Sequence, residues 1–258
     1  MKINQIKNKL LAGEASFGTF GWEFLVSGLP QIVRSSGAEF LIYDMEHAGT
    51  GYETLKNQIA LCRGIDLTPM CRVPTNQYHY ISRALDLGCM GIMAPMVGSA
   101  DEAEFIVSCT RYPPVGRRGA ALGFTADDYK QVNIADTMAA SNERVLVMAQ
   151  IETQEGLHHV EEIAAVSGID VLFLGHLDLT NFLGIPGQFT HPTYLEAVEK
   201  IANAARVHGK VLGCMSPSDE WSVQYWDFGF RMFAFGVDSM LLQSALSAGI
   251  GKLKTLTT

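Results

Sequence analysis

The sequence lacks the features that define several large classes of protein. No uninterrupted apolar run reaches the roughly 18 residues that a membrane span needs. The N-terminal segment MKINQIKNKLLAG is too polar, and its apolar part too short, for a signal peptide. The net charge is −8, and the chain has no basic patch and no run of Lys or Arg. We therefore expect neither a membrane nor a nucleic acid as a partner.

Cysteine is scarce, and linker-like segments are absent. The five cysteines are odd in number and include no C-x-x-C pair, so we interpret them as reduced core residues of a cytoplasmic protein. Low-complexity tracts and Pro/Ser-rich linkers do not occur. Because 48% of the residues are hydrophobic, residues 1–258 are predicted to form a single domain around one large core.

The chain does contain a regular alternation of short β-rich runs with amphipathic segments of helix length. Strands are predicted at residues 16–20, 39–43, 69–73, 91–94, 145–151, 170–174, 210–214 and 231–235. Helices are predicted at residues 52–63, 78–87, 100–110, 155–166, 192–208, 219–228 and 239–253. Eight strands with crossover helices predict a parallel (β/α)8 barrel, or TIM barrel. The alternative is a doubly wound open sheet, which the number of strands and the lack of G-x-G-x-x-G after the first strand disfavour.

One connection between predicted elements is longer than the others. Residues 115–143 form a long segment between two predicted elements and include GRRGAALGFTADDY. Segments of this length in a compact domain are often lids or interface arms. We expect one of these two roles here.

Polar side chains gather where the predicted strands end. The active site of a (β/α)8 barrel is built from the C-terminal ends of the strands and from the loops that follow them. The ends of the second, third, fifth and sixth predicted strands carry groups of complementary type: Asp44, Glu46, His47, Arg72, Gln150, Glu152, His176 and Asp178. We expect these side chains to lie within reach of one another across the barrel mouth.

Glu152 and Asp178 follow neighbouring strands, so their carboxylates are expected to face each other. Two close carboxylates repel, and a bound divalent cation removes that penalty. Two carboxylates with free positions for water and substrate suit Mg²⁺, Mn²⁺ or Co²⁺, whereas Zn²⁺ prefers more His or Cys ligands. The alternative for each residue alone is a helix cap, at the helix near Gln154 or at the segment LTNFLG. For the two residues together we favour a metal site.

Arg72 and His47 are the candidates for charge stabilisation and proton transfer. Arg72 would bind a carboxylate or stabilise an enolate oxygen. A structural salt bridge to Asp44 or Glu46 is its alternative role. His47 is the candidate for proton transfer, because histidine is the side chain suited to it near neutral pH, and one of the same two acids would orient it or tune its pKa. The alternative for His47 is a core histidine, which the neighbouring acids and its place at a strand end disfavour.

Gln150 and the lysines narrow the chemistry further. Gln150 lies on the same face of its strand as Glu152 and would donate to a water at the metal or to substrate. Enzymes that work through a Schiff base need a lysine at the barrel mouth. None of the nine lysines follows a strand end, and Lys210 begins its strand. Metal-assisted enolate chemistry is therefore predicted instead.

Several spaced motifs occur in a fixed order along most of the chain. YDMEHAG is similar to a D-x-E-H segment, and RVPTNQYHYISRALDLGCMGIMAPMV to an R-V-P…L-D-x-G…P-M-V block. RYPPVGRRG is similar to an R-Y-P-P-x-G-x-R-G loop, and AQIETQEGL and LGHLDLTNFLGIPGQFTHP follow it. Together they resemble the HpcH/HpaI aldolase family, the class II pyruvate-dependent aldolases, whose fold is a phosphoenolpyruvate/pyruvate-type barrel.

The resemblance implies a metal-dependent aldolase. It would cleave or form 4-hydroxy-2-oxo acids from an aldehyde and pyruvate, or hydroxypyruvate, through a metal-bound enolate. Glu152 and Asp178 would hold the divalent cation. Arg72 would stabilise the enolate oxygen. His47, with Asp44 beside it, would be the acid/base, and the Gln150 side chain would help to hold water or substrate.

The resemblance also implies an oligomer and a substrate turn. Asp86, in ALDLG, would reach across a subunit interface towards a neighbour's site in a homo-oligomer, a hexamer built as a trimer of dimers that exchange the last helix. Backbone N–H groups of Gly175, His176 and Leu177 would bind the substrate carboxylate. The family usually reads G-P-x-D-L-S where this chain reads GHLDLT. His176 in place of the usual Pro would loosen this turn or add a titratable, hydrogen-bonding group over the pocket.

Two other functions are the alternatives. An acyl-CoA lyase of the malyl or citryl type would need a basic surface near the mouth, and Arg117 and Arg118 are the only adjacent basic pair in that part of the chain. A barrel without catalysis would only bind a small acid. The complete set of acids, His47 and Arg72 at the strand ends argues against that second alternative.

Overall fold

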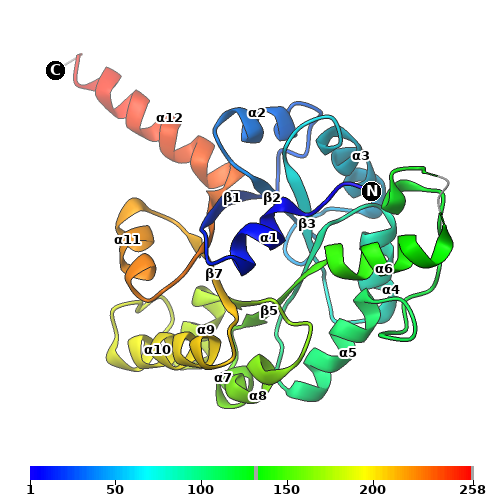
Figure 1. The fold of residues 1–258 in the computed structure, drawn as a ribbon. Coiled ribbons are helices and arrows are strands. Elements are labelled where there is room, and N and C mark those ends of the chain that lie inside the picture. The colour runs from blue at the N-terminus through cyan, green and yellow to red at the C-terminus, as the bar shows by residue number, and fades with distance from the viewer. Residues whose placement is uncertain (131–132, 257–258) are drawn as a thin grey trace.

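A computed structural model, which describes residues 1–130 and 133–256, contains a closed barrel of eight parallel strands (Figure 1). The strands are β1 (Ser16–Gly21), β2 (Phe40–Asp44), β3 (Thr68–Arg72), β4 (Gly91–Ala94), β5 (Leu146–Ile151), β6 (Val171–Leu174), β7 (Val211–Ser216) and β8 (Met232–Val237). Each strand pairs in parallel with the next, and β8 closes the barrel on β1. The predicted (β/α)8 barrel is confirmed, and the open sheet is wrong.

Helices surround the barrel and connect its strands. They are α1 (Gln5–Leu11), α2 (Leu29–Ser35), α3 (Tyr52–Cys62), α4 (Tyr78–Asp86), α5 (Ala100–Thr110), α6 (Ile134–Arg144), α7 (Gln154–His158), α8 (Val160–Ala165), α9 (His176–Phe182), α10 (Pro192–Val207), α11 (Asp219–Asp227) and α12 (Asp238–Lys254), with a 3-10 turn η1 (Thr125–Asp127). The single helix predicted at 155–166 is two helices, because the backbone leaves the helical conformation at His159 (φ −94°, ψ 14°). The short helices α1, α2, α6 and α9 were not predicted.

The core has two layers, one inside the barrel and one between the strands and the helices. Successive residues of a strand point to opposite faces. Phe40 and Ile42 fill the barrel interior, so Asp44 continues this inner face at the end of β2. The same alternation brings Arg72 to the inner end of β3, two residues after Met70. The strand pattern thus directs these polar ends into the mouth.

Where it is described, the long connection at 115–143 packs against the outside of the barrel and lines no part of the mouth cavity. Helix α5 runs back from the end of β4, so the segment after it begins at the N-terminal ends of the strands. Its η1 turn accepts a hydrogen bond from the Arg63 side chain at Thr125 O, and Asp128 accepts one from Lys2 N at 2.7 Å. The described part of the connection therefore does not cover its own mouth, which corrects the lid alternative. Residues 131–132 lie outside the described residues.

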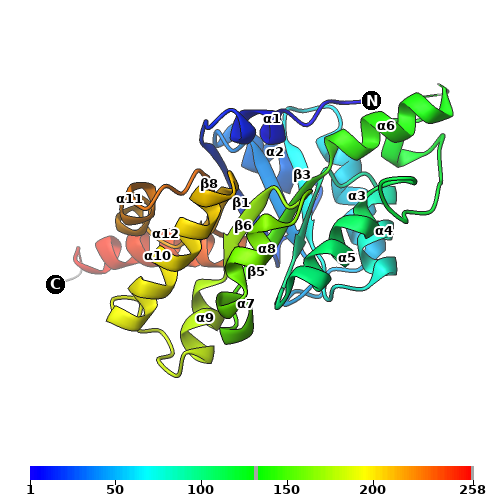
Figure 2. The same ribbon diagram turned by 60° about the horizontal axis from the view of Figure 1, so that its bottom comes forward.

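Helix α12 differs from the other long helices. It projects away from the barrel (Figures 1 and 2), and none of its residues is buried. Within residues 1–130 and 133–256, no helix is both long and apolar enough to cross a membrane. All five cysteines are free and buried, as predicted.

Candidate active site

A buried ion pair joins the ends of β2 and β3. Arg72 Nε and Nη2 donate to the two carboxylate oxygens of Asp44 at 2.7 and 2.9 Å. Nη1 of Arg72 lies 3.2 Å from Glu46 Oε2. Burial alone would lower the pKa of Arg72, but the hydrogen bonds and charge of Asp44 and the charge of Glu46 raise it. The predicted salt bridge is present, and the same guanidinium also lines the mouth cavity.

His47 lies at the rim of the mouth. Asp44 accepts hydrogen bonds from the backbone N–H groups of Glu46 and His47, both at 3.1 Å, so it fixes the main chain here and not the imidazole. His47 Nε2 lies 3.8 Å from Glu46 Oε2, and the imidazole meets the Trp22 ring edge-on at a centroid distance of 6.1 Å. Of the two acids predicted to orient His47, Glu46 is therefore the one near its ring.

Glu152 is held just beyond β5 and is only 1% exposed. Its Oε1 accepts the backbone N–H of Met96 at 2.7 Å, and its Oε2 accepts the side-chain amide of Gln150. The Gln150 amide thus orients this carboxylate. The N-cap of α7 is Thr153, whose hydroxyl accepts the N–H of Gly156 at 2.9 Å. The helix-cap alternative for Glu152 is therefore wrong.

Asp178 is the third residue of α9, the helix that follows β6. It is partly exposed and lines the cavity. Helix α9 has Gly175 as its N-cap and no side-chain capping bond, so the cap alternative for Asp178 is also wrong. The charge of Asp178 raises the pKa of both Glu152 and Glu46, which places the three acids in one electrostatic cluster.

The turn between β6 and α9 is built around Gly175. A Cβ atom at this position would overlap the Glu152 side chain, so only glycine lets the two segments approach this closely. The backbone N–H of Gly175 donates to Ile151 O at 3.1 Å and is not available to a ligand. This corrects the prediction for Gly175. The backbone N–H groups of His176 and Leu177 lie in the first turn of α9, where no side chain caps them.

His176 is buried beneath the turn and is packed among aromatic rings. Its imidazole lies 5.5 Å from the Phe189 ring and 5.0 Å from the Trp221 ring, both edge-on, by centroid distance. Burial lowers the pKa of His176 to about 4. Its imidazole is therefore uncharged at neutral pH, which corrects the expectation of a group that titrates there.

Burial and neighbouring negative charges destabilise the ionised form of two acids at the mouth, Glu46 and Glu152. Burial, together with the charges of Glu46 and Asp178, raises the pKa of Glu152 to about 7, although the hydrogen bonds that its carboxylate accepts oppose the shift. Burial also raises the pKa of Glu46 to about 7, with Arg72 opposing the shift and Asp44 adding to it. The charges of Asp44, Glu46 and Glu152 act on one guanidinium, and Asp178 adds a fourth carboxylate that acts on the two glutamates. Side chains with such perturbed pKa values cluster at functional sites.

A cavity of about 110 Å³ opens between these groups. It is lined by Phe20, Trp22, His47, Arg72, Gln150, Phe173, Leu174, Gly175, His176, Leu177, Asp178 and Met215. Arg72 is the only Lys or Arg among these lining residues, in agreement with the prediction against a Schiff base. No group of three or more His, Cys, Asp or Glu in the described ranges is placed to hold a metal ion. A cation held by two carboxylates would take its other ligands from water or substrate.

Three predicted residues lie away from this cavity. Asp86 ends α4 at the N-terminal face of the barrel, where it binds Arg118 Nη2 at 2.8 Å. Asp86 therefore does not belong to its own chain's mouth, and a role in a neighbour's site stays a prediction. Arg117 and Arg118 lie at the same face, with Arg117 over the Phe105 ring at 5.1 Å. The mouth thus lacks the basic pair that the acyl-CoA alternative would use.

Trp22 belongs to the site although no motif of the sequence includes it. In the structure its ring lines the cavity and lies 5.7 Å from the Arg72 guanidinium carbon, by ring centroid. Its position directly after β1 was the only available signal.

The fold and the site together define a (β/α)8 enzyme with an acid-rich mouth. The chain belongs to the HpcH/HpaI aldolase/citrate lyase family, whose model matches residues 28–245. It is 35% identical over 243 residues to the 5-keto-4-deoxy-D-glucarate aldolase of Escherichia coli O9:H4 (strain HS), covering 94% of this chain and 93% of that protein. The predicted family and the predicted carbon-carbon lyase class are confirmed.

Solved structures agree with this assignment. The HpcH/HpaI aldolase from Desulfitobacterium hafniense DCB-2 is 30% identical, with a TM-score of 0.92 and 96% of each chain covered. The citrate synthase SbnG is 28% identical, with a TM-score of 0.88 and 98% of each chain covered. A second reaction type therefore occurs on closely similar barrels.

Proposed function

We propose that the protein is a metal-dependent aldolase that cleaves, and in reverse forms, a 4-hydroxy-2-oxo acid. The products of cleavage are an aldehyde and pyruvate, or hydroxypyruvate. The observation that carries the proposal is the cluster of four carboxylates around Arg72 at the mouth. The aldolase relative that acts on 5-keto-4-deoxy-D-glucarate supports a sugar-acid derivative as the substrate class. The buried, unpaired cysteines support a cytoplasmic enzyme.

The residues present fit a divalent cation. Aldolases of this family generally depend on one. Glu152 and Asp178 would hold it, because carboxylate oxygens are the ligands that these cations prefer. The charge of Asp178 also raises the pKa of Glu152, and a bound cation would offset this repulsion. Mg²⁺, Mn²⁺ or Co²⁺ bound there would supply a Lewis acid that stabilises negative charge on the oxygens of the 2-oxo acid.

The chain's own groups would divide the remaining work. In cleavage the C4 hydroxyl loses its proton, the C3–C4 bond breaks, and its electron pair stays on the 2-oxo acid as an enolate that is then protonated at C3. His47 would move the proton at the rim of the cavity. Arg72, fixed by Asp44, would stabilise the charge that develops on the enolate oxygen. The backbone N–H groups of His176 and Leu177 would orient the substrate carboxylate.

The direct test is the release of pyruvate or hydroxypyruvate from a panel of 4-hydroxy-2-oxo acids that includes sugar-acid derivatives. The assay is run with EDTA and then with Mg²⁺, Mn²⁺ or Co²⁺ added back. We expect release that stops with the chelator and returns with the metal. If folded protein releases neither product from any member of the panel, the aldolase proposal is wrong. Turnover of a malyl- or citryl-CoA thioester in the same assay would favour the acyl-CoA alternative.

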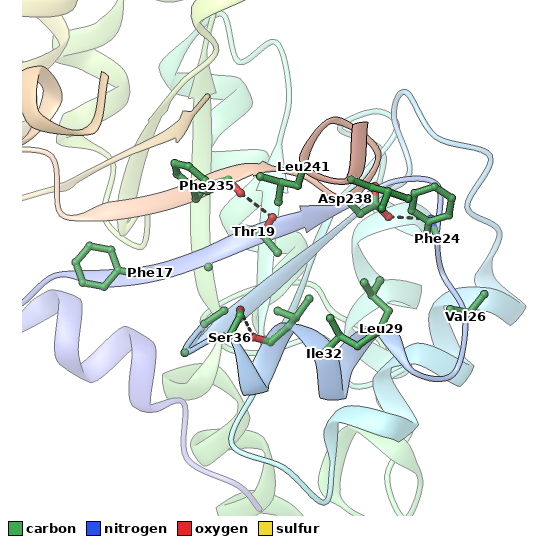
Figure 3. Close-up of a pocket in the computed structure, with 15 residues that line it drawn as sticks. Phe17, Thr19, Phe24, Val26, Leu29, Ile32, Ser36, Phe235, Asp238 and Leu241 are labelled. Atoms are coloured by element: carbon green, nitrogen blue, oxygen red, sulfur yellow. Dashed lines mark hydrogen bonds between the residues drawn. The ribbon is translucent and has the colours of Figure 1, made fainter. Parts of the chain in front are cut away.

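We also propose that the enzyme works as a homo-oligomer in which a second copy covers α12. This helix exposes a row of large apolar side chains: Met240, Leu241, Leu242, Leu246, Ile250 and Leu253. Beside its base lies an apolar hollow of about 710 Å³ between α12, α2 and the outer faces of β1 and β8 (Figure 3). Phe17, Ile32 and Phe235 face solvent around it. Exposed apolar surface of this extent marks an interface between protein chains.

An exchange of α12 between two copies would bury the helix and fill the hollow together. A hexamer built as a trimer of dimers, with Asp86 reaching a neighbour's mouth, is the arrangement we propose. Light scattering of the wild type and of Leu246→Asp with Ile250→Asp tests the role of the helix. We expect a lower mass for the double variant, and a wild-type monomer would contradict the proposal.

A further inference from the structure

Asp238, the first residue of α12, binds the loop that leaves β1. Its carboxylate accepts the backbone N–H groups of three consecutive residues: Trp22 at 3.2 Å, Glu23 at 3.1 Å and Phe24 at 2.8 Å. It also accepts the N–H of Ser239 at 2.8 Å. Charged acceptors make the stronger class of hydrogen bond. One side chain therefore fixes the main chain of a whole loop (Figure 3 shows the bond to Phe24).

A bulge in β8 aims Asp238 at this loop. Between the pairs Gly18↔Ala234 and Phe20↔Val237, β8 has one residue more than β1. Gly236 adopts φ +61°, a conformation that favours glycine, and the Thr19 hydroxyl donates to Phe235 O at 2.8 Å across the irregular pairing. A bulge changes the direction of the residues that follow it. Asp238 is thereby placed over the end of β1.

The loop carries Trp22 to the catalytic cavity. The indole ring lies edge-on to the His47 imidazole at 6.1 Å and near the Arg72 guanidinium at 5.7 Å. Its buried Nε1 atom has no hydrogen-bond partner among the residues the structure describes. The orientation of the ring therefore depends on packing and on the position of its backbone, which Asp238 sets.

We propose that Asp238 is a positioning residue for the reaction: it holds Trp22 against His47 and Arg72, and so links the start of α12 to the shape of the catalytic cavity. The proposal rests on the proposed aldolase function for its kinetic consequences. His47 is half-exposed, so the Trp22 ring is the aromatic surface that restricts its imidazole. Small displacements of catalytic groups have large effects on rate.

A double-mutant cycle tests whether Asp238 acts through Trp22. We expect Asp238→Ala and Trp22→Ala each to lower kcat roughly 100-fold, because misplacement by about 1 Å has that effect. KM for the 2-oxo acid should change less. The double variant should be no slower than either single variant, since residues that act as a unit are not additive. Multiplying effects in the double variant would overturn the proposal.

A second measurement needs no substrate. The chain has three tryptophans, and Trp221→Phe with Trp226→Phe leaves Trp22 as the only tryptophan, whose emission can be excited selectively over that of tyrosine. In that background we expect Asp238→Ala to raise acrylamide quenching of Trp22, and Asp238→Asn, which keeps one carbonyl acceptor, to raise it less. Unchanged quenching would overturn the proposal. If quenching rises but the wild type releases neither pyruvate nor hydroxypyruvate, the positioning contact stands and the aldolase function fails.

Asp219→Ala is the matched control. Asp219 begins α11 as Asp238 begins α12, but it is exposed and makes no hydrogen bond or ion pair with the described residues. The Asp219→Ala substitution removes an acid from the first turn of α11, the helix that follows β7. It should change neither kcat nor the quenching of Trp22. Light scattering of every variant checks that the oligomeric mass is retained. If Asp238→Ala does not fold, Asp238→Asn carries both measurements.

Discussion

The two ends of the barrel handle charge in opposite ways. At the N-terminal face two acids pair with lysines: Lys7 lies 3.2 Å from Asp170, and Lys9 lies 2.6 Å from Glu39. Burial raises the pKa of Glu39, but hydrogen bonds from Lys9 and from the Phe17 N–H outweigh it and lower the value. At the mouth, burial raises the pKa values of two glutamates to about 7.

This difference indicates that the N-terminal face contributes to stability and that the mouth contributes to function. Balanced pairs at the N-terminal face stabilise the barrel, in keeping with the usual division of labour in this fold. The mouth retains ionisable acids that its own cations do not balance. Such an arrangement lowers the stability of the unliganded protein. The binding of a positively charged ligand offsets this loss of stability. The comparison predicts that substitutions at the two ends have opposite consequences.

The largest expected effect is on turnover. Glu152→Gln or Asp178→Asn should lower kcat at least roughly 1,000-fold, because the cation that these acids would hold contributes several kcal/mol of charge stabilisation. The same Glu152→Gln change should stabilise the EDTA-treated protein against urea, since it removes a stressed carboxylate. Full activity in either variant, with the fold intact, would rule out the proposed metal ligands.

The control for this prediction lies at the other end of the barrel. Asp170 accepts the backbone N–H of Val147 at 2.8 Å and pairs with Lys7. Asp170→Asn should lower the free energy of unfolding by about 1–3 kcal/mol, the typical effect of a weakened buried charged hydrogen bond, and leave kcat unchanged. A large fall in kcat here would break the division between the two ends.

A smaller effect is expected from the glycine that admits Glu152. Gly175→Ala places a Cβ atom within the space of the Glu152 side chain and should push its carboxylate away from Gln150. We expect kcat to fall roughly 100-fold, as for other small displacements of catalytic groups. Gly64→Ala is the control, because a Cβ atom there meets open space at the N-terminal face. Equal activity of the two variants would contradict the close approach.

The smallest effect is a pH dependence of stability. The pKa of Glu152 is about 7 in the folded protein, above its ordinary value of 4.5. The folded state therefore binds the proton more tightly, and this stabilisation is complete below pH 4.5 and is lost as the pH rises through 7. In EDTA, the Tm of the wild type relative to Glu152→Gln should fall by a few degrees between pH 5 and pH 8.

The difference in Tm between the wild type and Glu152→Gln is used because it removes the contribution of His176. The pKa of His176 is lowered to about 4, so its contribution runs in the opposite direction and weakens the fold as the pH falls below 6.5. Both proteins contain His176, so its contribution cancels. Added Mg²⁺ or Mn²⁺ should raise the wild-type Tm more at pH 8 than at pH 5. A difference in Tm that does not change with pH would show that Glu152 is not under stress.

The barrel and the polar residues at its mouth could be predicted from the amino-acid sequence alone. Eight β-rich runs with crossover helices leave few other folds, and period-two alternation assigns Asp44 and Arg72 to the inner ends of their strands. The same periodicity predicts which strand precedes each acid. Local periodicity is a property of neighbouring residues, so it survives in the sequence.

Which of these side chains contact one another could not be predicted from the sequence and depends on the folded barrel. Arg72 binds Asp44 in a bidentate pair, and Glu46, not Asp44, lies near the His47 ring. The long connection begins at the N-terminal face because α5 reverses the chain before it, and its described residues line no part of its own mouth, which its composition does not reveal. Asp238 fixes Trp22 across more than 200 residues of sequence. Such contacts depend on barrel closure, which brings β8 beside β1, and no local pattern encodes that distance.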